Sequence, residues 1–207
     1  MKIIVVSAHP DDMEISCGGT LKRLNNAGAD IISVVAIRPS REVTEGRSEL
    51  IVQQELNASY SISNFQLKVF DTPLHHNGRP NLVADNVTMT EFEKLLEPCD
   101  IAILPDPQDH HQDHKNTYQL ALPWAVKNAQ EIWCVKTVPY CHFHADNNAN
   151  LFFNISAEWD FKQSLLECYS SYLTPERIND IRIANQYWAL RSQCGVAEAF
   201  TILQKNV

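Results

Sequence analysis

The segment Ala8-His9-Pro10-Asp11-Asp12 places one imidazole and two adjacent carboxylates directly after the apolar run Ile3-Ile4-Val5-Val6. The run predicts a short buried strand, so these polar side chains would lie at its end. Because Asp11 and Asp12 are neighbours, their side chains point in different directions, and one carboxylate can bind a metal ion while the other accepts a proton. On its own, the segment equally fits a solvated turn, since Pro and Asp are common turn residues.

A second polar cluster, much later in the chain, favours the chemical interpretation. Residues 105–114 read Pro-Asp-Pro-Gln-Asp-His-His-Gln-Asp-His and follow another apolar run, Ile101-Ala102-Ile103-Leu104. In an open parallel sheet the carboxyl ends of the strands lie along one edge, so the two clusters can meet there. His9, Asp12 and His114 would then form a set of two imidazoles and one carboxylate with open positions for water, which is typical of a catalytic zinc site.

The rest of the chain must supply the elements that position these residues. Apolar runs alternate with amphipathic stretches, which predicts an α/β fold: one Rossmann-like domain over residues 1–207, with a mostly parallel central sheet flanked by helices. The expected strands are 2–7, 30–37, 66–70, 100–104, 132–139, 151–155 and 200–204. The expected helices are 18–24 with an end near Gly28, 48–59 with Ser48 as its cap, 90–96, 113–128, 159–170 and 178–193.

Gly18-Gly19 follows the first strand, but the Gly-x-Gly-x-x-Gly pattern of dinucleotide-binding proteins is absent. We therefore expect these glycines to let a helix pack closely on the sheet and to leave room over the metal.

Composition narrows the class of protein. The net charge is −8 and the 17 basic residues are scattered, which argues against a nucleic acid or an anionic membrane surface as partner. A neutral or cationic small molecule fits better. Met1-Lys2 leads directly into the first strand, so we expect neither a signal peptide nor a membrane anchor, and a cytoplasmic protein. Exposed faces of such sheets often pair, so the chain could also form a homo-oligomer.

The two clusters together resemble the zinc-dependent N-acetylglucosaminyl deacetylase family, which includes LmbE-like proteins and GPI-precursor de-N-acetylases (the PIG-L superfamily). The resemblance rests on Ala8-His9-Pro10-Asp11-Asp12, Glu14, Gly18-Gly19 and Asp109-x-His111-x-Asp113-His114, and less specifically on residues 195–200. The chain departs from the family pattern at Gln112, where relatives often have Pro, and at Leu56-Asn57, where they have Leu-Gly. The loops 38–47 and 73–85 do not align, which leaves the choice of substrate open.

The resemblance implies a hydrolase that removes the acetyl group from an N-acetylated amino sugar, such as an N-acetylglucosamine-containing substrate or glycoconjugate. It would use one Zn²⁺ per chain, held by His9, Asp12 and His114, although other divalent transition metals suit the same ligands. When bound, the ion lowers the pKa of a water molecule and polarises the acetamide carbonyl. Asp11 is the expected general base, and either Asp11 or His111 could return a proton to the departing amine.

Three further residues of the second cluster receive expected roles. As its counterpart does in the family, His111, held by Asp113, would be protonated and stabilise the oxyanion. Asp109 would bind an imidazole ligand through the ring nitrogen that does not contact the metal, and so orient that ring.

Substrate contacts are expected among residues that follow strands on the same sheet edge. Arg38 and Arg47 could bind sugar hydroxyls, a phosphate or a carboxylate, and His144 could contact the sugar. Each of them also fits an ordinary solvated loop residue.

Two other functions stay open. The chain could bind carbohydrate without turnover, although the residues expected to do the chemistry are all present. It could also be a metal-dependent phosphoesterase, which would need carboxylates that bridge two metal ions. The number of metal ions per chain distinguishes the phosphoesterase from the deacetylase.

Overall fold

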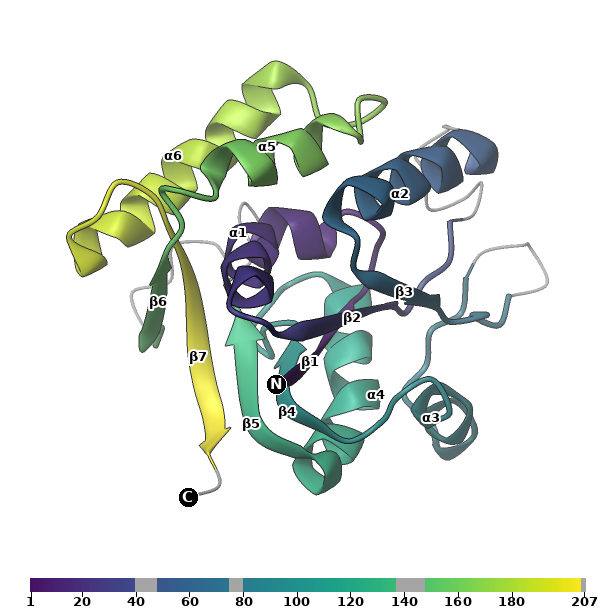
Figure 1. Cartoon of the computed structure of the whole chain (residues 1–207). Coiled ribbons are helices and arrows are strands. Elements are labelled where there is room, and N and C mark those ends of the chain that lie inside the picture. Colours follow the sequence, from purple (N-terminus) through teal and green to yellow (C-terminus); the bar gives the residue numbers. More distant parts are fainter. Residues whose placement is uncertain (40–47, 75–79, 137–147, 206–207) are drawn as a thin grey trace.

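Strands and helices alternate along the chain in the computed structural model, which describes residues 1–39, 48–74, 80–136 and 148–205 (Figure 1). The strands are β1 (Lys2–Ser7), β2 (Asp30–Val35), β3 (Gln66–Val69), β4 (Cys99–Leu104), β5 (Ala129–Val135), β6 (Leu151–Asn154) and β7 (Ala197–Lys205). The helices are α1 (Asp12–Asn26), α2 (Glu49–Ser63), α3 (Asn86–Glu93), α4 (Gln112–Asn128), α5 (Trp159–Glu167) and α6 (Pro175–Ser192).

The strands form one sheet in the order β3-β2-β1-β4-β5-β7-β6. The pairs from β3 to β5 are parallel, whereas β7 runs antiparallel to both β5 and β6. The predicted α/β fold with a mostly parallel sheet is therefore confirmed. Since β1 and β4 are parallel neighbours, the loops that carry the two polar clusters leave the sheet side by side.

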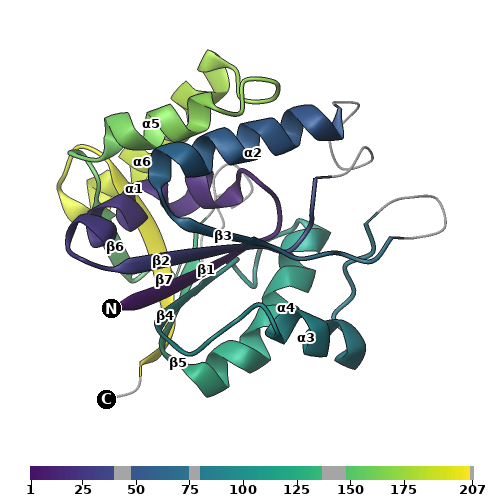
Figure 2. The same cartoon turned by 45° about the vertical axis from the view of Figure 1, so that its right-hand side comes forward.

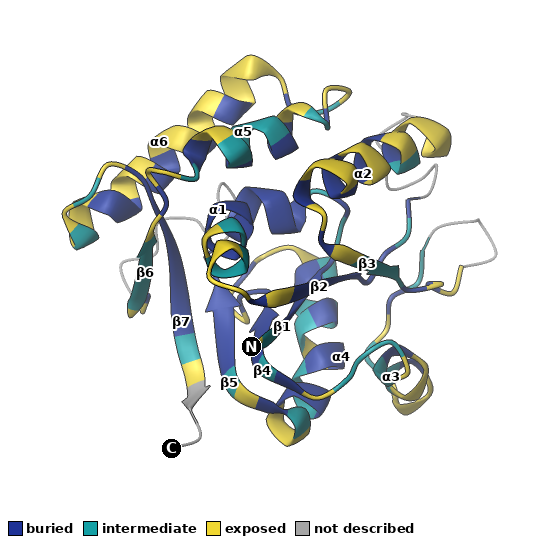
Figure 3. Cartoon of the chain, viewed as in Figure 1, coloured by how far each residue is buried: buried dark blue, intermediate teal, exposed yellow. Residues whose placement is uncertain are grey.

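Helices cover both faces of the sheet, with α3 and α4 on one face and α1 and α2 on the other (Figure 2). The central strands are buried, as Figure 3 shows, because alternate side chains of each strand serve opposite faces. In β1, Ile4 and Val6 pack toward α4, while Ile3 and Val5 pack toward α1 and α2. Helix α5 lies on α1 as a further layer. Among the described helices, none has the length and apolar character needed to cross a bilayer.

Helix α1 differs from the sequence prediction. We expected it to open at Gly18-Gly19, but it begins at Asp12 and contains both glycines. A Cβ atom on Gly19 would lie 2.7 Å from Ile155 Cδ1, so glycine here allows close approach of the segment after β6 rather than leaving room over the metal. The predicted end near Gly28 is confirmed, since Gly28 follows the helix with a φ of 91°.

Most other boundaries agree within a few residues. Ser48 caps α2, as predicted, by accepting a hydrogen bond from the Ile51 N–H at 3.1 Å. Helix α3 begins earlier than expected, after its cap Asp85, and β5 begins at Ala129.

Candidate metal centre

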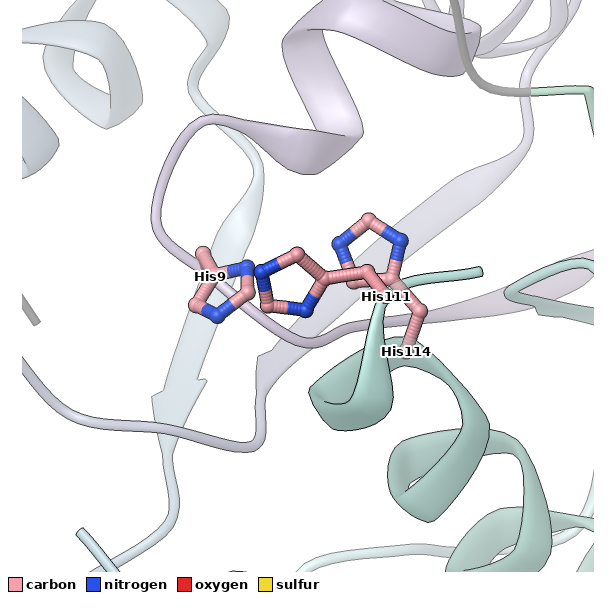
Figure 4. A group of neighbouring side chains, drawn as sticks. All are labelled: His9, His111 and His114. Carbon is pink, nitrogen blue, oxygen red and sulfur yellow. The ribbon is translucent and has the colours of Figure 1, made fainter. Parts of the chain in front are cut away.

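Three imidazoles meet where the loops after β1 and β4 leave the sheet (Figure 4). Nitrogen atoms of His9, His111 and His114 all lie within 4.8 Å of one another. His9 precedes α1, His111 is the N-cap of α4, and His114 lies in the first turn of α4. Because β1 and β4 are neighbours, the sheet topology brings these distant residues to one place.

Asp12 adds a carboxylate to this cluster. Its Oδ2 lies 3.4 Å from His9 Nδ1 and 3.3 Å from His114 Nε2. Ligand atoms at about 2.0–2.2 Å from a tetrahedral zinc ion lie about 3.3–3.6 Å from one another. The Asp12 contacts to both imidazoles therefore have the spacing of ligand atoms around an ion of this size.

Two further carboxylates contact the ring nitrogens of His9 and His114 that point away from Asp12. Asp113 Oδ2 lies 2.9 Å from His9 Nε2, and Asp109 Oδ2 lies 2.6 Å from His114 Nδ1. In metal sites, such carboxylates fix the tautomer and direct the other ring nitrogen at the ion. The Asp113 carboxylate thus lies closer to His9 than to the expected partner His111, whose Nδ1 is 3.9 Å from Asp113 Oδ2 and accepts the Asp113 N–H.

The charges at the site favour a bound cation. Burial alone would lower the pKa of His9, but the charge of Asp12 and the bond to Asp113 outweigh it and raise the pKa to about 9. For His114, burial is likewise outweighed by Asp12 and Asp109, and the pKa rises to about 11. Although burial opposes ionisation of Asp12, the imidazoles of His114 and His9 hold its pKa well below the usual range. Metal binding must therefore displace protons from these imidazoles.

His111 differs from the other two imidazoles. Burial, followed by the charges of His9 and His114, lowers its pKa, which favours the neutral ring over the protonated ring that the resemblance implies. Its Nδ1 accepts the Asp113 N–H at 3.2 Å, which leaves the ring proton on Nε2. A neutral His111 can still donate this N–H to an oxyanion.

The other residues that the sequence predicted for the site are the expected base Asp11 and the expected substrate contacts Arg38, Arg47 and His144. Asp11 is the half-buried N-cap residue of α1, and its side chain makes no capping hydrogen bond. Arg38 follows β2 and pairs with the exposed carboxylate of Asp71 at 2.5 Å. Arg47 and His144 lie outside the described residues.

Glu14 belongs to the first motif, yet the sequence suggested no role for it. Its carboxyl group is fully buried, and its Oε1 lies 2.5 Å from Ser59 Oγ and 2.8 Å from the Tyr169 hydroxyl. Burial raises the pKa of Glu14 to about 8. The folded protein therefore keeps this carboxyl protonated at neutral pH.

We expect Glu14 to make the protein less stable as the pH rises from 4.5 to about 8. Over this range the folded chain holds a proton that the unfolded chain has released, so the free energy of unfolding falls by up to about 1.4 kcal/mol per pH unit. Glu14→Gln should remove this part of the slope. Urea unfolding of both proteins across the range measures the difference, and equal slopes would show that Glu14 is ionised.

A buried ion pair, which the sequence did not indicate, supports α1 behind the site. Lys162 Nζ lies 2.6 Å from Glu198 Oε1, and both side chains are fully buried. Lys162 also donates to the Ile15 carbonyl at 2.8 Å, while the Glu198 carboxylate accepts the N–H groups of Gly19 at 3.1 Å and of Thr20 at 2.6 Å. The pair thus ties α5 and β7 to the backbone of α1.

Comparison with known proteins identifies the family. The model of the GlcNAc-PI de-N-acetylase family (PIG-L) matches residues 4–125, which is more than half of the chain and includes both polar clusters. The uncharacterized deacetylase YaiS of Escherichia coli K12 is 28% identical over 124 residues, which cover 58% of this chain and 65% of YaiS. The match thus spans slightly less than two thirds of that relative.

Solved structures share the fold at low sequence identity. The N,N'-diacetylchitobiose deacetylase from Pyrococcus horikoshii, complexed with its inhibitor MPG, has a TM-score of 0.76 at 18% identity, covering 98% of this chain and 83% of that one. The 4-carboxy-2-hydroxymuconate hydratase GalB from Pseudomonas putida KT2440 has a TM-score of 0.73 at 16% identity, covering 100% and 97%. The fold alone therefore does not decide the reaction. The family match over both polar clusters does decide the family: this chain belongs to the GlcNAc-PI de-N-acetylase (PIG-L) family.

Proposed function

We propose that this protein is a metal-dependent N-deacetylase that hydrolyses the acetamide of an N-acetylglucosamine-containing substrate. The observation that carries the proposal is the spacing of Asp12 Oδ2 from His9 Nδ1 and His114 Nε2, within the part of the chain that matches the family. Membership of a de-N-acetylase family supports the reaction class, and the net charge of −8 suits a neutral or cationic small molecule. Self-association and a cytoplasmic location stay predictions.

The residues of the site divide the chemistry among them. His9, Asp12 and His114 would hold zinc or another divalent transition metal, which lowers the pKa of a water molecule and polarises the acetamide carbonyl. Asp11 takes a proton from the attacking water as general base. His111 donates its Nε2–H to the oxygen that gains negative charge. As the C–N bond breaks, Asp11 returns the proton taken from water to the nitrogen, or a protonated His111 supplies one in its place, which yields acetate and an amine.

A panel of N-acetylated sugars tests this function. It contains free N-acetylglucosamine, an N-acetylated disaccharide and an N-acetylglucosaminyl lipid, and both acetate and free amine are measured. We expect at least one member to give the two products in equal amounts, only with metal present. Sugar binding without product would favour the non-catalytic alternative. Phosphate release from phosphate esters with two metal ions per chain would favour a phosphoesterase, and hydration of a carbon–carbon double bond would favour a hydratase.

The ligand set can be tested separately from activity. We expect Asp12→Ala to raise the Kd for Zn²⁺ by at least about 100-fold, because it removes a ligand, and His111→Asn to change it less than about tenfold. Asn is chosen because it can still cap α4. Competition with a chelator of known affinity measures both values. The reverse result would assign the metal to the three imidazoles of His9, His111 and His114 instead.

A further inference from the structure

We infer that Tyr169 is a positioning residue for the loop that carries Asp11 between the proposed ligands His9 and Asp12. The inference rests on the proposed function and adds a residue from outside the part of the chain that matches the family. Tyr169 follows α5, and only 2% of its surface is exposed. Its hydroxyl group donates to the Pro10 carbonyl oxygen at 2.5 Å. This bond joins the layer of α5 to the first polar cluster.

The Pro10 carbonyl is the group through which the orientation of Asp11 can be held. The planar peptide that joins these two residues contains both the Pro10 C=O and the Asp11 N–H. The pyrrolidine ring already restricts φ of Pro10, so rotation about its ψ is the remaining freedom that turns this plane. A hydrogen bond to the carbonyl oxygen restrains that rotation, and with it the direction in which the Asp11 side chain leaves the backbone.

The Tyr169 hydroxyl also contacts the other side of the turn that carries Asp11 and Asp12. The Tyr169 oxygen lies 2.8 Å from Glu14 Oε1, in the first turn of α1, and Ser59 of α2 donates to that same carboxyl oxygen at 2.5 Å. Tyr169 therefore contacts the residue before Asp11 and a residue just after Asp12. The residues that bracket the proposed base and ligand are held by one buried group.

A buried tyrosine hydroxyl usually forms a hydrogen bond simply because it is buried, without any role in positioning a site. Another buried tyrosine of this chain provides a control for such a purely structural role. Tyr60 in α2 is also buried, and its hydroxyl donates to Ser33 Oγ in β2 rather than to the loop before α1. Tyr60→Phe and Tyr169→Phe each delete one buried hydroxyl and keep the aromatic ring. A merely structural role predicts the same consequences for both variants.

The experiment compares kcat and KM for acetate release, the Kd for Zn²⁺ without substrate, and the urea midpoint of unfolding. We expect Tyr169→Phe to lower kcat by about 10- to 100-fold with KM within about twofold, and to weaken Zn²⁺ binding severalfold. Tyr60→Phe should keep kcat and Kd within about twofold of the parent, with a comparable loss in the urea midpoint. Equal kcat values for the two variants would overturn the inference.

The Zn²⁺ measurement separates this inference from the proposed function. If the parent protein deacetylates no substrate of the panel, the proposed function fails and the Kd values decide. Weaker Zn²⁺ binding in Tyr169→Phe than in Tyr60→Phe would then support a positioning role for Tyr169. Equal Kd values would overturn it.

Discussion

Asp11→Asn should lower kcat for deacetylation by about 10²- to 10⁴-fold, which is the usual contribution of a general base. Asparagine has nearly the same shape as aspartate, but its amide cannot take the proton of the attacking water. Asp11 makes no side-chain cap for α1, so the variant should keep the helix and the fold. Steady-state kinetics of acetate release with saturating Zn²⁺ measures the effect.

Metal content is the control for this variant. His9, Asp12 and His114 are unchanged in Asp11→Asn, so it should bind as much metal as the parent protein, and KM should change little. Loss of the metal in Asp11→Asn would make Asp11 a ligand rather than a base. Full activity with normal metal content would assign the base to another residue.

Glu198→Gln should destabilise the protein by about 3–5 kcal/mol, the usual cost of removing one partner from a buried ion pair. Lys162 and Glu198 are both fully buried, so the lysine would keep an uncompensated charge without water. The glutamine amide has one oxygen in place of two, so it also cannot accept the N–H groups of Gly19 and Thr20 as the carboxylate does. Urea unfolding at neutral pH measures the loss.

Two further variants show that burial causes this effect. Glu91 and Lys94 form an exposed ion pair at 2.6 Å, and Glu91→Gln should change the stability little. Combining Lys162→Met with Glu198→Leu should recover part of the loss, because no unpaired charge remains. If Glu198→Gln behaves like Glu91→Gln, the Lys162–Glu198 pair does not support α1 as described.

The sheet and the meeting of the two clusters could be predicted, because each cluster follows an apolar strand of a parallel sheet. The start of α1 could not. Two glycines inside a helix cost stability, so Gly18-Gly19 suggested a helix start, whereas the close approach of Ile155 and the Glu198 carboxylate compensate for them in the folded chain.

Contacts between side chains were the least predictable part of the site. Asp113 follows His111 closely in sequence, but its carboxylate turns to His9, a choice that depends on its rotamer in the fold. Lys162 shares the buried face of α5 with Trp159 and Leu166, although a lysine is normally exposed and the sequence does not show what would neutralise its charge. Its partner Glu198 lies in β7, and no sequence spacing connects the two.

We expect acetate release to require a metal ion at the site of His9, Asp12 and His114. The most direct test titrates chelated protein with Zn²⁺ and follows acetate release from an N-acetylated sugar of the panel. Without metal we expect no acetate release; with added Zn²⁺ the rate should rise linearly and stop rising at one equivalent per chain. A rate independent of metal, or no acetate from any substrate although Zn²⁺ binds, would contradict it.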